Sequence, residues 1–188
     1  MKFNKSVVAV IILLIVAGSL FRILNFAPQI AMGVFGGAVI KDKRLAFVLP
    51  LLSMFISDIL FEVLYNYGLS SYGGFYVGQI TNYILMAGVV LIGFTARNLK
   101  LNRIIIATLA APSVYFLVSN FLVWLNMAGF SEAGFNRPKT FSGLMLCYND
   151  AIPFFRSGLI NTIVFSAILF GGYFLAQRYL LGRKQLSS

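Results

Sequence analysis

Apolar residues form six runs along the chain, and charged residues separate them. The runs cover about residues 7–21, 28–40, 45–65, 75–96, 104–127 and 157–177, and a more polar outer segment, about 128–156, precedes the last run. A helix that crosses a bilayer needs about 20 apolar residues. The pattern therefore predicts an all-α membrane protein, a bundle of about six transmembrane helices that forms a single domain over residues 1–188.

The first two runs are shorter than the others. The run 7–21 follows two lysines and ends in small residues, so it also fits a signal peptide that is removed from the mature protein. The run 28–40 contains Gly33, Gly36 and Gly37, which favours a tilted or partly re-entrant helix inside the bundle. Gly33 and Gly37 are also spaced for close helix packing, either within the bundle or against a second membrane protein.

The composition agrees with a membrane protein. Hydrophobic residues make up 60% of the chain, charged residues make up 11%, and the mean hydropathy is +0.89. Soluble domains are nearer about 45–50% apolar and about 25% charged. The chain has no His and one Cys, which excludes an internal disulfide and the common His- or Cys-based metal sites. We therefore expect neither a metal nor a cofactor.

The basic residues alternate between the two sides of the predicted bundle. With the N-terminus in the cytoplasm, eleven of the 15 Lys and Arg residues lie at cytoplasmic ends of spans. Cytoplasmic loops carry such an excess of Lys and Arg, so both termini are predicted to be cytoplasmic. This topology explains the net charge of +10 without a nucleic-acid partner and makes the lipid bilayer the expected surroundings. The outer basic residues are Arg22, Arg137, Lys139 and Arg156.

The polar residues of the predicted spans gather in their outer halves. A charge at the bilayer centre costs at least about 2.5–3.5 kcal/mol, so such residues normally face a bundle interior or an aqueous cavity. We therefore predict an outward-facing pocket for a small solute, with apolar walls and a few convergent polar groups. The candidate substrate-binding residues are Arg22, Asn25, Asp58, Asn82, Asn120, Trp124, Cys147, Tyr148, Asp150 and Arg156.

The charged candidates suggest how a solute would be held. Asp58 and Asp150 would take a cationic or donor-rich part of the solute. Arg22 or Arg156 would take an anionic part, or would neutralise the carboxylates while the pocket is empty. A structural interpretation stays open, in which Asp58 pairs with Arg22 or Arg156 inside the bundle and the amide side chains link neighbouring helices.

The uncharged candidates would orient the solute in the pocket and cover it. Asn120 would orient the solute by hydrogen bonds, and Trp124 and Tyr148 would stack on it, although such aromatic residues also anchor helices at the membrane interface. The segment 147–155 is too apolar for an ordinary exposed loop, so we expect it to fold back over the bundle as a lid. Cys147 within this segment is expected to pack, with metal ligation or nucleophilic chemistry as alternatives.

No catalytic constellation is found in the sequence. Without any His, Cys147 has no Cys–His pair. Asp58 and Asp150 could share a proton as an aspartyl pair, but their spacing matches no known pattern. We therefore assign no catalytic residue and rank an intramembrane enzyme behind the other functions.

Five groups of residues occur in an order that resembles a widespread family of uncharacterised bacterial membrane proteins. They are Arg22-x-x-Asn25-Phe26-Ala27-Pro28; Ala31-Met32-x-x-Phe35-Gly36-Gly37-Ala38; Leu49-Pro50-Leu51 with Ser57-Asp58; Ser119-Asn120-Phe121-x-Val123-Trp124; and Gly143-Leu144-x-x-Cys147-Tyr148 with Ile152-Pro153-Phe154-Phe155. More distantly, the architecture is similar to the S components of energy-coupling factor (ECF) transporters. Those have an Ala-x-x-x-Ala docking face in their first helix, which residues 7–21 lack.

The ECF resemblance implies a binding subunit in the bacterial cytoplasmic membrane. Such a subunit takes a vitamin-like or metal-cofactor-like solute from the outside and works with an ECF-type transmembrane subunit and ATPases, or alone. We therefore expect an S-component-like, multi-pass solute-binding protein. The alternative is a non-transporting subunit or assembly factor of a membrane complex, whose polar residues form an interhelical network.

Overall fold

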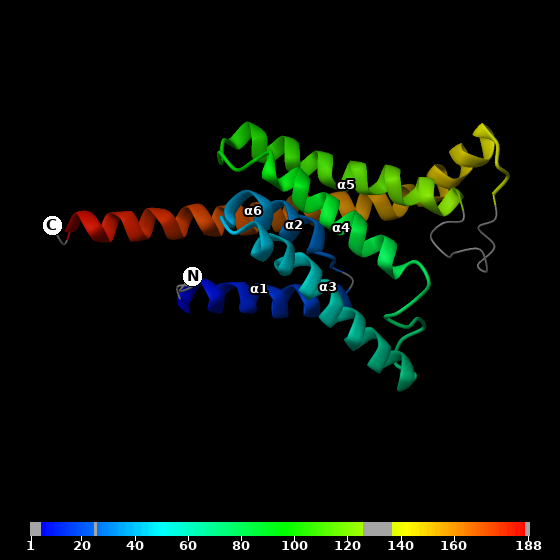
Figure 1. Cartoon of the computed structure of the whole chain (residues 1–188), viewed down its shortest axis with the longest axis horizontal. Coiled ribbons are helices and arrows are strands. Elements are labelled where there is room, and N and C mark those ends of the chain that lie inside the picture. Colours follow the sequence, from blue (N-terminus) through cyan, green and yellow to red (C-terminus); the bar gives the residue numbers. More distant parts are fainter. Residues whose placement is uncertain (1–4, 25, 126–136, 187–188) are drawn as a thin grey trace.

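The computed structural model describes residues 5–24, 26–125 and 137–186, and their side chains between residues 9 and 179. Within these ranges it is all-helical and contains no strand, as the apolar runs predict (Figure 1). The helices are α1 (Lys5–Ile23), α2 (Gln29–Val39), α3 (Lys43–Asn66), α4 (Gln79–Phe94), α5 (Leu101–Trp124) and α6 (Phe141–Leu186).

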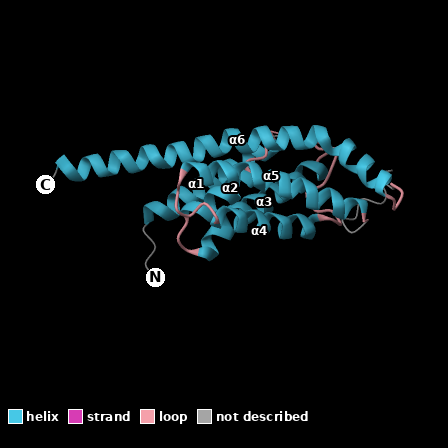
Figure 2. Cartoon of the chain, turned by 90° about the horizontal axis from the view of Figure 1, so that it is seen from above, coloured by secondary structure: helices cyan, strands magenta, loops and turns pink. Residues whose placement is uncertain are grey.

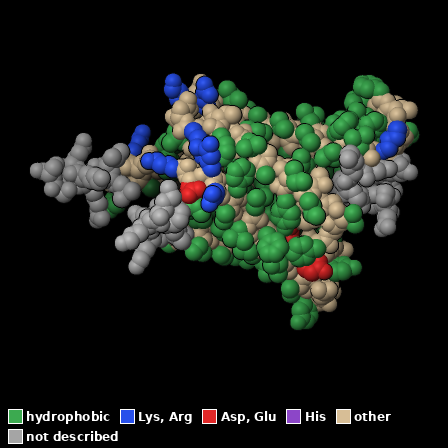
Figure 3. All heavy atoms as spheres, in the orientation of Figure 1, with side chains coloured by type: hydrophobic (Ala, Val, Ile, Leu, Met, Phe, Trp, Pro, Cys, Tyr) green, Lys and Arg blue, Asp and Glu red, His purple; other side chains and the backbone are tan. Residues whose placement is uncertain are grey.

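Three of the helices are long and apolar enough to cross a membrane. They cover Lys43–Asn66, Leu101–Trp124 and Phe141–Tyr179, whereas the apolar parts of α1, α2 and α4 are shorter. Large apolar side chains cover much of the outer surface, as Figure 3 shows in green. Such a surface is unfavourable in water and favourable against lipid. These helices and this surface are those of a membrane protein.

The last helix is longer than the sequence predicts. We expected a loop-like outer segment to residue 156 and a span from residue 157, but α6 begins at Phe141 and has 46 residues. The segment 147–155 is therefore part of a helix and does not form the expected lid. Its residues are mostly apolar, and it includes Pro153, a residue type that membrane helices tolerate. At its other end α6 projects beyond the remaining helices (Figure 2).

Helix α2 forms the centre of the bundle. Residues 31–38 are all buried, and the helix has only 11 residues, which cover about 16 Å at about 1.5 Å per residue. A Cβ atom added at Gly37 would lie 2.5 Å from the carbonyl oxygen of Val90, and one added at Gly93 would lie 2.6 Å from that of Val34. The two glycines therefore allow the backbones of α2 and α4 to touch. The Gly33–Gly37 pattern serves internal packing, since Gly33 also faces Val89 of α4.

The basic side chains gather at one end of the bundle. Figure 3 shows them beside the α2–α3 and α4–α5 connections, and a smaller group lies at the opposite end. The exposed members of the larger group include Lys41, Lys43, Arg44, Lys100 and Arg103. Arg97 has a structural role there: its Nε donates to the Gly37 carbonyl oxygen at 3.1 Å, which satisfies an otherwise free acceptor at the C-terminus of α2.

Candidate functional site

A buried carboxylate is the centre of the candidate site. Asp58 lies on α3 toward the end of the bundle opposite the larger basic group, and its side chain is 0% exposed. Its Oδ1 forms an ion pair with Nη1 of Arg22 from α1. Its Oδ2 accepts hydrogen bonds from Nε2 of Gln79 and, at 2.5 Å, from Oη of Tyr83, both on α4. Three helices therefore converge on one carboxylate, which we call the Asp58 cluster: Arg22, Asp58, Gln79 and Tyr83.

Arg22 reaches this carboxylate from the last turn of α1. Its Nη1 also donates to Ser57 Oγ at 2.6 Å and to the Met54 carbonyl oxygen at 3.2 Å, both on α3. The guanidinium lies 5.5 Å from the centre of the Phe61 ring, a cation–π distance. The side chain is 24% exposed, so Arg22 reaches the surface of the bundle, which Asp58 does not. A cation at a helix C-terminus is also favoured by the helix dipole.

Gln79 and Tyr83 reach the same carboxylate because they are four residues apart on one face of α4. Gln79 is 4% exposed, and its Nε2 donates to Asp58. Its Oε1 is buried and accepts no hydrogen bond within the described part of the chain. A buried acceptor without a donor is unfavourable, and such groups are uncommon in folded proteins. This oxygen marks a place where a donor from a bound molecule would be stabilised.

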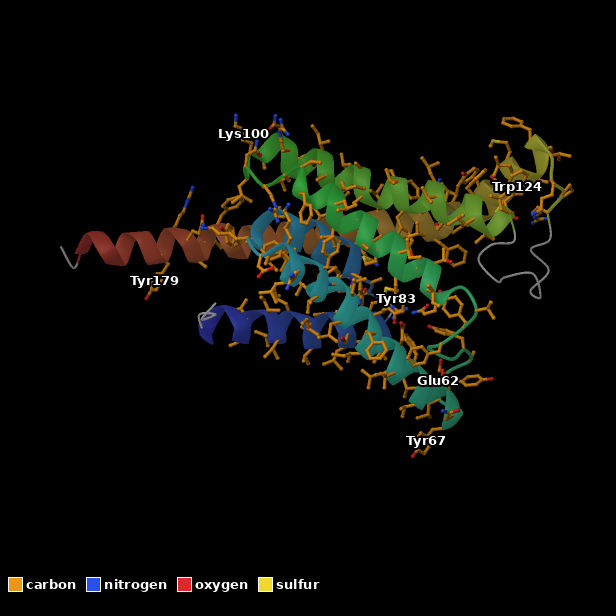
Figure 4. The ribbon with its side chains drawn as sticks, in the orientation of Figure 1. Glu62, Tyr67, Tyr83, Lys100, Trp124 and Tyr179 are labelled. Atoms are coloured by element: carbon orange, nitrogen blue, oxygen red, sulfur yellow. The ribbon has the colours of Figure 1, made fainter. Side chains whose placement is uncertain are left out.

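The connection between α3 and α4, residues 67–78, lies directly against the cluster. A Cβ atom at Gly74 would lie 1.7 Å from the Asp58 carbonyl oxygen, so only glycine allows this approach. Glu62, one turn after Asp58, accepts the backbone N–H groups of Gly74 at 3.0 Å and Phe75 at 3.2 Å. Figure 4 shows Glu62 on the part of α3 nearest this connection, with Tyr83 toward the bundle centre. The Glu62 carboxylate thus helps to hold the connection over the cluster.

Asn82 extends the polar contacts from α4 to α5. Its Nδ2 donates to Tyr76 Oη, and its Oδ1 accepts from Tyr115 Oη at 3.0 Å. Asn82 comes three residues after Gln79, so it lies on nearly the same face of α4. It therefore borders the Asp58 cluster and joins it to the neighbouring helix.

The remaining candidates lie in a second group, between the end of α5 and the start of α6. Asp150 forms an ion pair with Arg137, and both side chains are about one-third exposed. Trp124 Nε1 donates to the Pro138 carbonyl oxygen at 2.9 Å. Figure 4 places Trp124 well away from Tyr83 and Glu62. We call this the α5–α6 group.

Three more contacts in the α5–α6 group join side chains to backbone. Cys147 Sγ lies 3.5 Å from the Asn120 carbonyl oxygen, in a weak donor contact. Asn120 Nδ2 donates to the carbonyl oxygen of Phe116 at 2.8 Å, one turn earlier in the same helix. Tyr148 Oη donates to the Leu117 carbonyl oxygen at 2.9 Å. The Cys147 and Tyr148 contacts fasten α6 to α5, whereas the Asn120 bond stays within α5. All three use polar atoms that we expected to face a solute.

The structure thus separates the predicted pocket residues. Arg22, Asp58 and Asn82 lie together, whereas Asn120, Trp124, Cys147, Tyr148 and Asp150 lie in the α5–α6 group. Arg156 is exposed on α6, and Asn25 lies outside the described residues. The candidate list omitted Gln79, Tyr83 and Ser57, all of which contact the ion pair. Tyr83 could have been found from its position four residues after the polar Gln79, on the same helix face. No sequence pattern indicated Ser57.

One open groove lies elsewhere, between α5 and α6 and toward the larger basic group. Its volume is about 400 Å³ and its lining is almost entirely apolar, with Ile104, Leu109 and Phe170 among the residues. The hydroxyls of Thr108 and Ser166 line it and have no hydrogen-bond partner in the described residues. The groove contains no charged residue and is separate from the Asp58 cluster.

Comparison with known proteins places the chain in a family. A family model described as "Family of unknown function (DUF6580)" matches residues 2–185, which is nearly the whole chain. Comparisons with curated proteins and with solved structures gave no match. The motifs quoted from the sequence resemble an uncharacterised family, and this match agrees with them. On this match, the chain belongs to the family of unknown function DUF6580.

Proposed function

We propose that this protein is a membrane-embedded, S-component-like protein that binds a small solute at the Asp58 cluster. The observation that carries the proposal is the buried Gln79 Oε1, which has no donor in the described residues although it lies beside a buried ion pair. Buried acceptors are usually satisfied. The Oε1 of Gln29, between α1 and α2, also lacks a donor in the described residues, but that of Gln79 differs because its amide is bonded to a buried ion pair. A solute with a suitable donor would complete the hydrogen bonding of this site.

The Arg22–Asp58 ion pair closes the site when no solute is bound. Asp58 is fully buried and needs a counter-ion, and Arg22 supplies one from a partly exposed position. The 67–78 connection covers the site, and two of its backbone N–H groups bond to Glu62. Release of these bonds would open a path from the end of the bundle to Asp58. This role replaces the lid that we expected from residues 147–155.

In the proposed arrangement all six helices cross the cytoplasmic membrane of a bacterium, and both termini are cytoplasmic. The larger basic group then lies in the cytoplasm, as the positive-inside rule requires, and the Asp58 cluster opens to the outside. Helix α2 is shorter than the hydrocarbon core of about 30 Å, and protein surrounds it. Because protein rather than lipid surrounds α2, this helix does not have to span the full thickness of the membrane.

Cysteine labelling tests this topology in intact cells. Lys41→Cys and Lys100→Cys, each in a Cys147→Ser background, would resist a membrane-impermeant maleimide until the cells are opened. Tyr67→Cys and Lys139→Cys, at exposed positions of the opposite end, would react at once. The reverse pattern would place the Asp58 cluster on the cytoplasmic side and would contradict uptake from the outside.

The α5–α6 groove favours a second candidate function, a subunit of a membrane complex. Its unpartnered Thr108 and Ser166 hydroxyls are of the kind that bond across transmembrane helices. Such a partner could be an ECF-type transmembrane subunit with its ATPases, or a complex that transports nothing. Capture of a stoichiometric membrane partner by a protein without any solute would favour this function.

Native mass spectrometry of the protein in mild detergent, followed by analysis of its small molecules, tests solute binding. A solute should co-purify with the natural protein and be lost from the Asp58→Asn variant. Asp42→Asn is the matched control: it makes the same chemical change at a distant helix cap, where Asn is equally suitable. A protein that is empty in every preparation and is stabilised by no added solute would refute the proposal.

A further inference from the structure

One nitrogen position in the Asp58 cluster has an unusual set of neighbours. Nη1 of Arg22 contacts three acceptors on α3: Asp58 Oδ1, Ser57 Oγ at 2.6 Å and the Met54 carbonyl oxygen at 3.2 Å. Ser57 directs its own proton to the Met54 carbonyl at 2.8 Å, so it offers a lone pair to the nitrogen. An N–H₂ group of a guanidinium has only two protons for these three acceptors.

The pairing of Arg22 with Asp58 is also incomplete. Strong Arg–carboxylate pairs commonly use two parallel N–H···O bonds. Here all hydrogen bonds of the guanidinium to described residues come from Nη1, and the second carboxylate oxygen binds Gln79 and Tyr83 instead. Among the described residues the pair is therefore held through a single nitrogen of the guanidinium.

We infer that the solute carries a primary ammonium group, which takes the place of Arg22 Nη1 at Asp58; this inference rests on the solute-binding function proposed above. An –NH₃⁺ group has three donors, one for each of the three acceptors at that position. The Phe61 ring, which now lies 5.5 Å from the guanidinium carbon, would face the new cation instead. Gln79 Oε1 is available to a further donor of the same solute.

The exchange keeps the buried charge balanced. Asp58 is 0% exposed, so removal of Arg22 without another cation would leave an uncompensated carboxylate inside the bundle. A neutral or anionic head group cannot supply that charge. Arg22 can move into solvent because it stands on the last turn of α1 and is already 24% exposed. The site therefore selects a cation with N–H donors.

Four small probes separate charge from donor number. Butylammonium, trimethylbutylammonium, butyramide and butyrate have main chains of equal carbon number, counting the carbonyl carbon, and differ in the head group. Calorimetric titration of the full-length protein in mild detergent should show butylammonium binding at least about tenfold more tightly than each of the others, since each lacks the charge, the three donors or both. Equal binding of trimethylbutylammonium, or binding of butyrate or butyramide alone, would overturn the ammonium assignment while leaving a solute site in place.

Two variants test the exchange itself. Asp58→Asn should weaken butylammonium binding about tenfold or more, whereas Arg22→Met should strengthen it by a similar factor because the competing cation is gone. Asp42→Asn should leave it unchanged. Weaker binding to Arg22→Met would mean that Arg22 holds the solute, and would refute the exchange. If Arg22→Met does not fold, the probe series and Asp58→Asn decide. If no probe binds the natural protein, the inference fails, and co-purification separately decides the proposed function.

Discussion

Replacement of Arg22 by Met removes the only cation that contacts Asp58 among the described residues and keeps a long apolar side chain. Asp58 then remains wholly buried, with two neutral donors, Gln79 and Tyr83, and no counter-ion. Removal of one partner of a buried ion pair typically costs about 3–5 kcal/mol. We expect Arg22→Met to lower the free energy of unfolding by this amount.

The reciprocal variant should cost less. Asp58→Asn removes the buried charge and leaves Arg22 free to turn into solvent, where it is already 24% exposed. The expected loss is about 1.5–3 kcal/mol, the usual value of a hydrogen bond to a charged group. The double variant has no stranded charge, so it should be about as stable as Asp58→Asn. The coupling energy between the two positions then equals in magnitude the loss expected for Arg22→Met, about 3–5 kcal/mol, which is at or above the upper end of the range for residues in contact.

Unfolding in mixed micelles with increasing dodecyl sulfate provides the assay. Trp124 is the single tryptophan of the chain, and its indole binds the Pro138 carbonyl at the start of the segment that leads into α6, so its fluorescence reports on tertiary structure. A loss below about 1 kcal/mol for Arg22→Met, or additive effects in the double variant, would refute the reasoning. Either result would mean that Asp58 does not depend on this ion pair.

Three further substitutions test the backbone contacts around the site. Gly74→Ala should destabilise the protein by about 3 kcal/mol because the new Cβ meets the Asp58 carbonyl oxygen; an unaffected variant would mean that the connection does not pack there. Gly37→Ala should cost about 1–3 kcal/mol at the α2–α4 contact, whereas Gly88→Ala, which faces open space in α4, should stabilise by up to about 1 kcal/mol. A similar effect of both would contradict the close contact. Glu62→Gln should speed amide hydrogen exchange in residues 67–78 about tenfold, and unchanged exchange would show that Glu62 does not hold the connection.

The helical class of the protein was readable from the sequence because it follows from local pattern and composition. Apolar runs bounded by charges require helices in lipid, since only helices and closed barrels satisfy every backbone group there. The start of α6 was not readable in the same way. Residues 141–156 contain polar groups and Pro153, and they are bonded to α5 by contacts that no local pattern reveals, such as that of Tyr148 to the Leu117 carbonyl.

The candidate site shows the same division. The sequence by itself determined that Asp58 is a charge within an apolar run and must be compensated, because an isolated carboxylate in such surroundings is too unfavourable. It left both Arg22 and Arg156 as partners. Only the tertiary structure decided for Arg22, since the packing of α1 on α3 brings together residues that are 36 positions apart. It likewise paired Asp150 with Arg137 and placed Gly74 against the Asp58 carbonyl, because these contacts depend on where segments meet rather than on any local period.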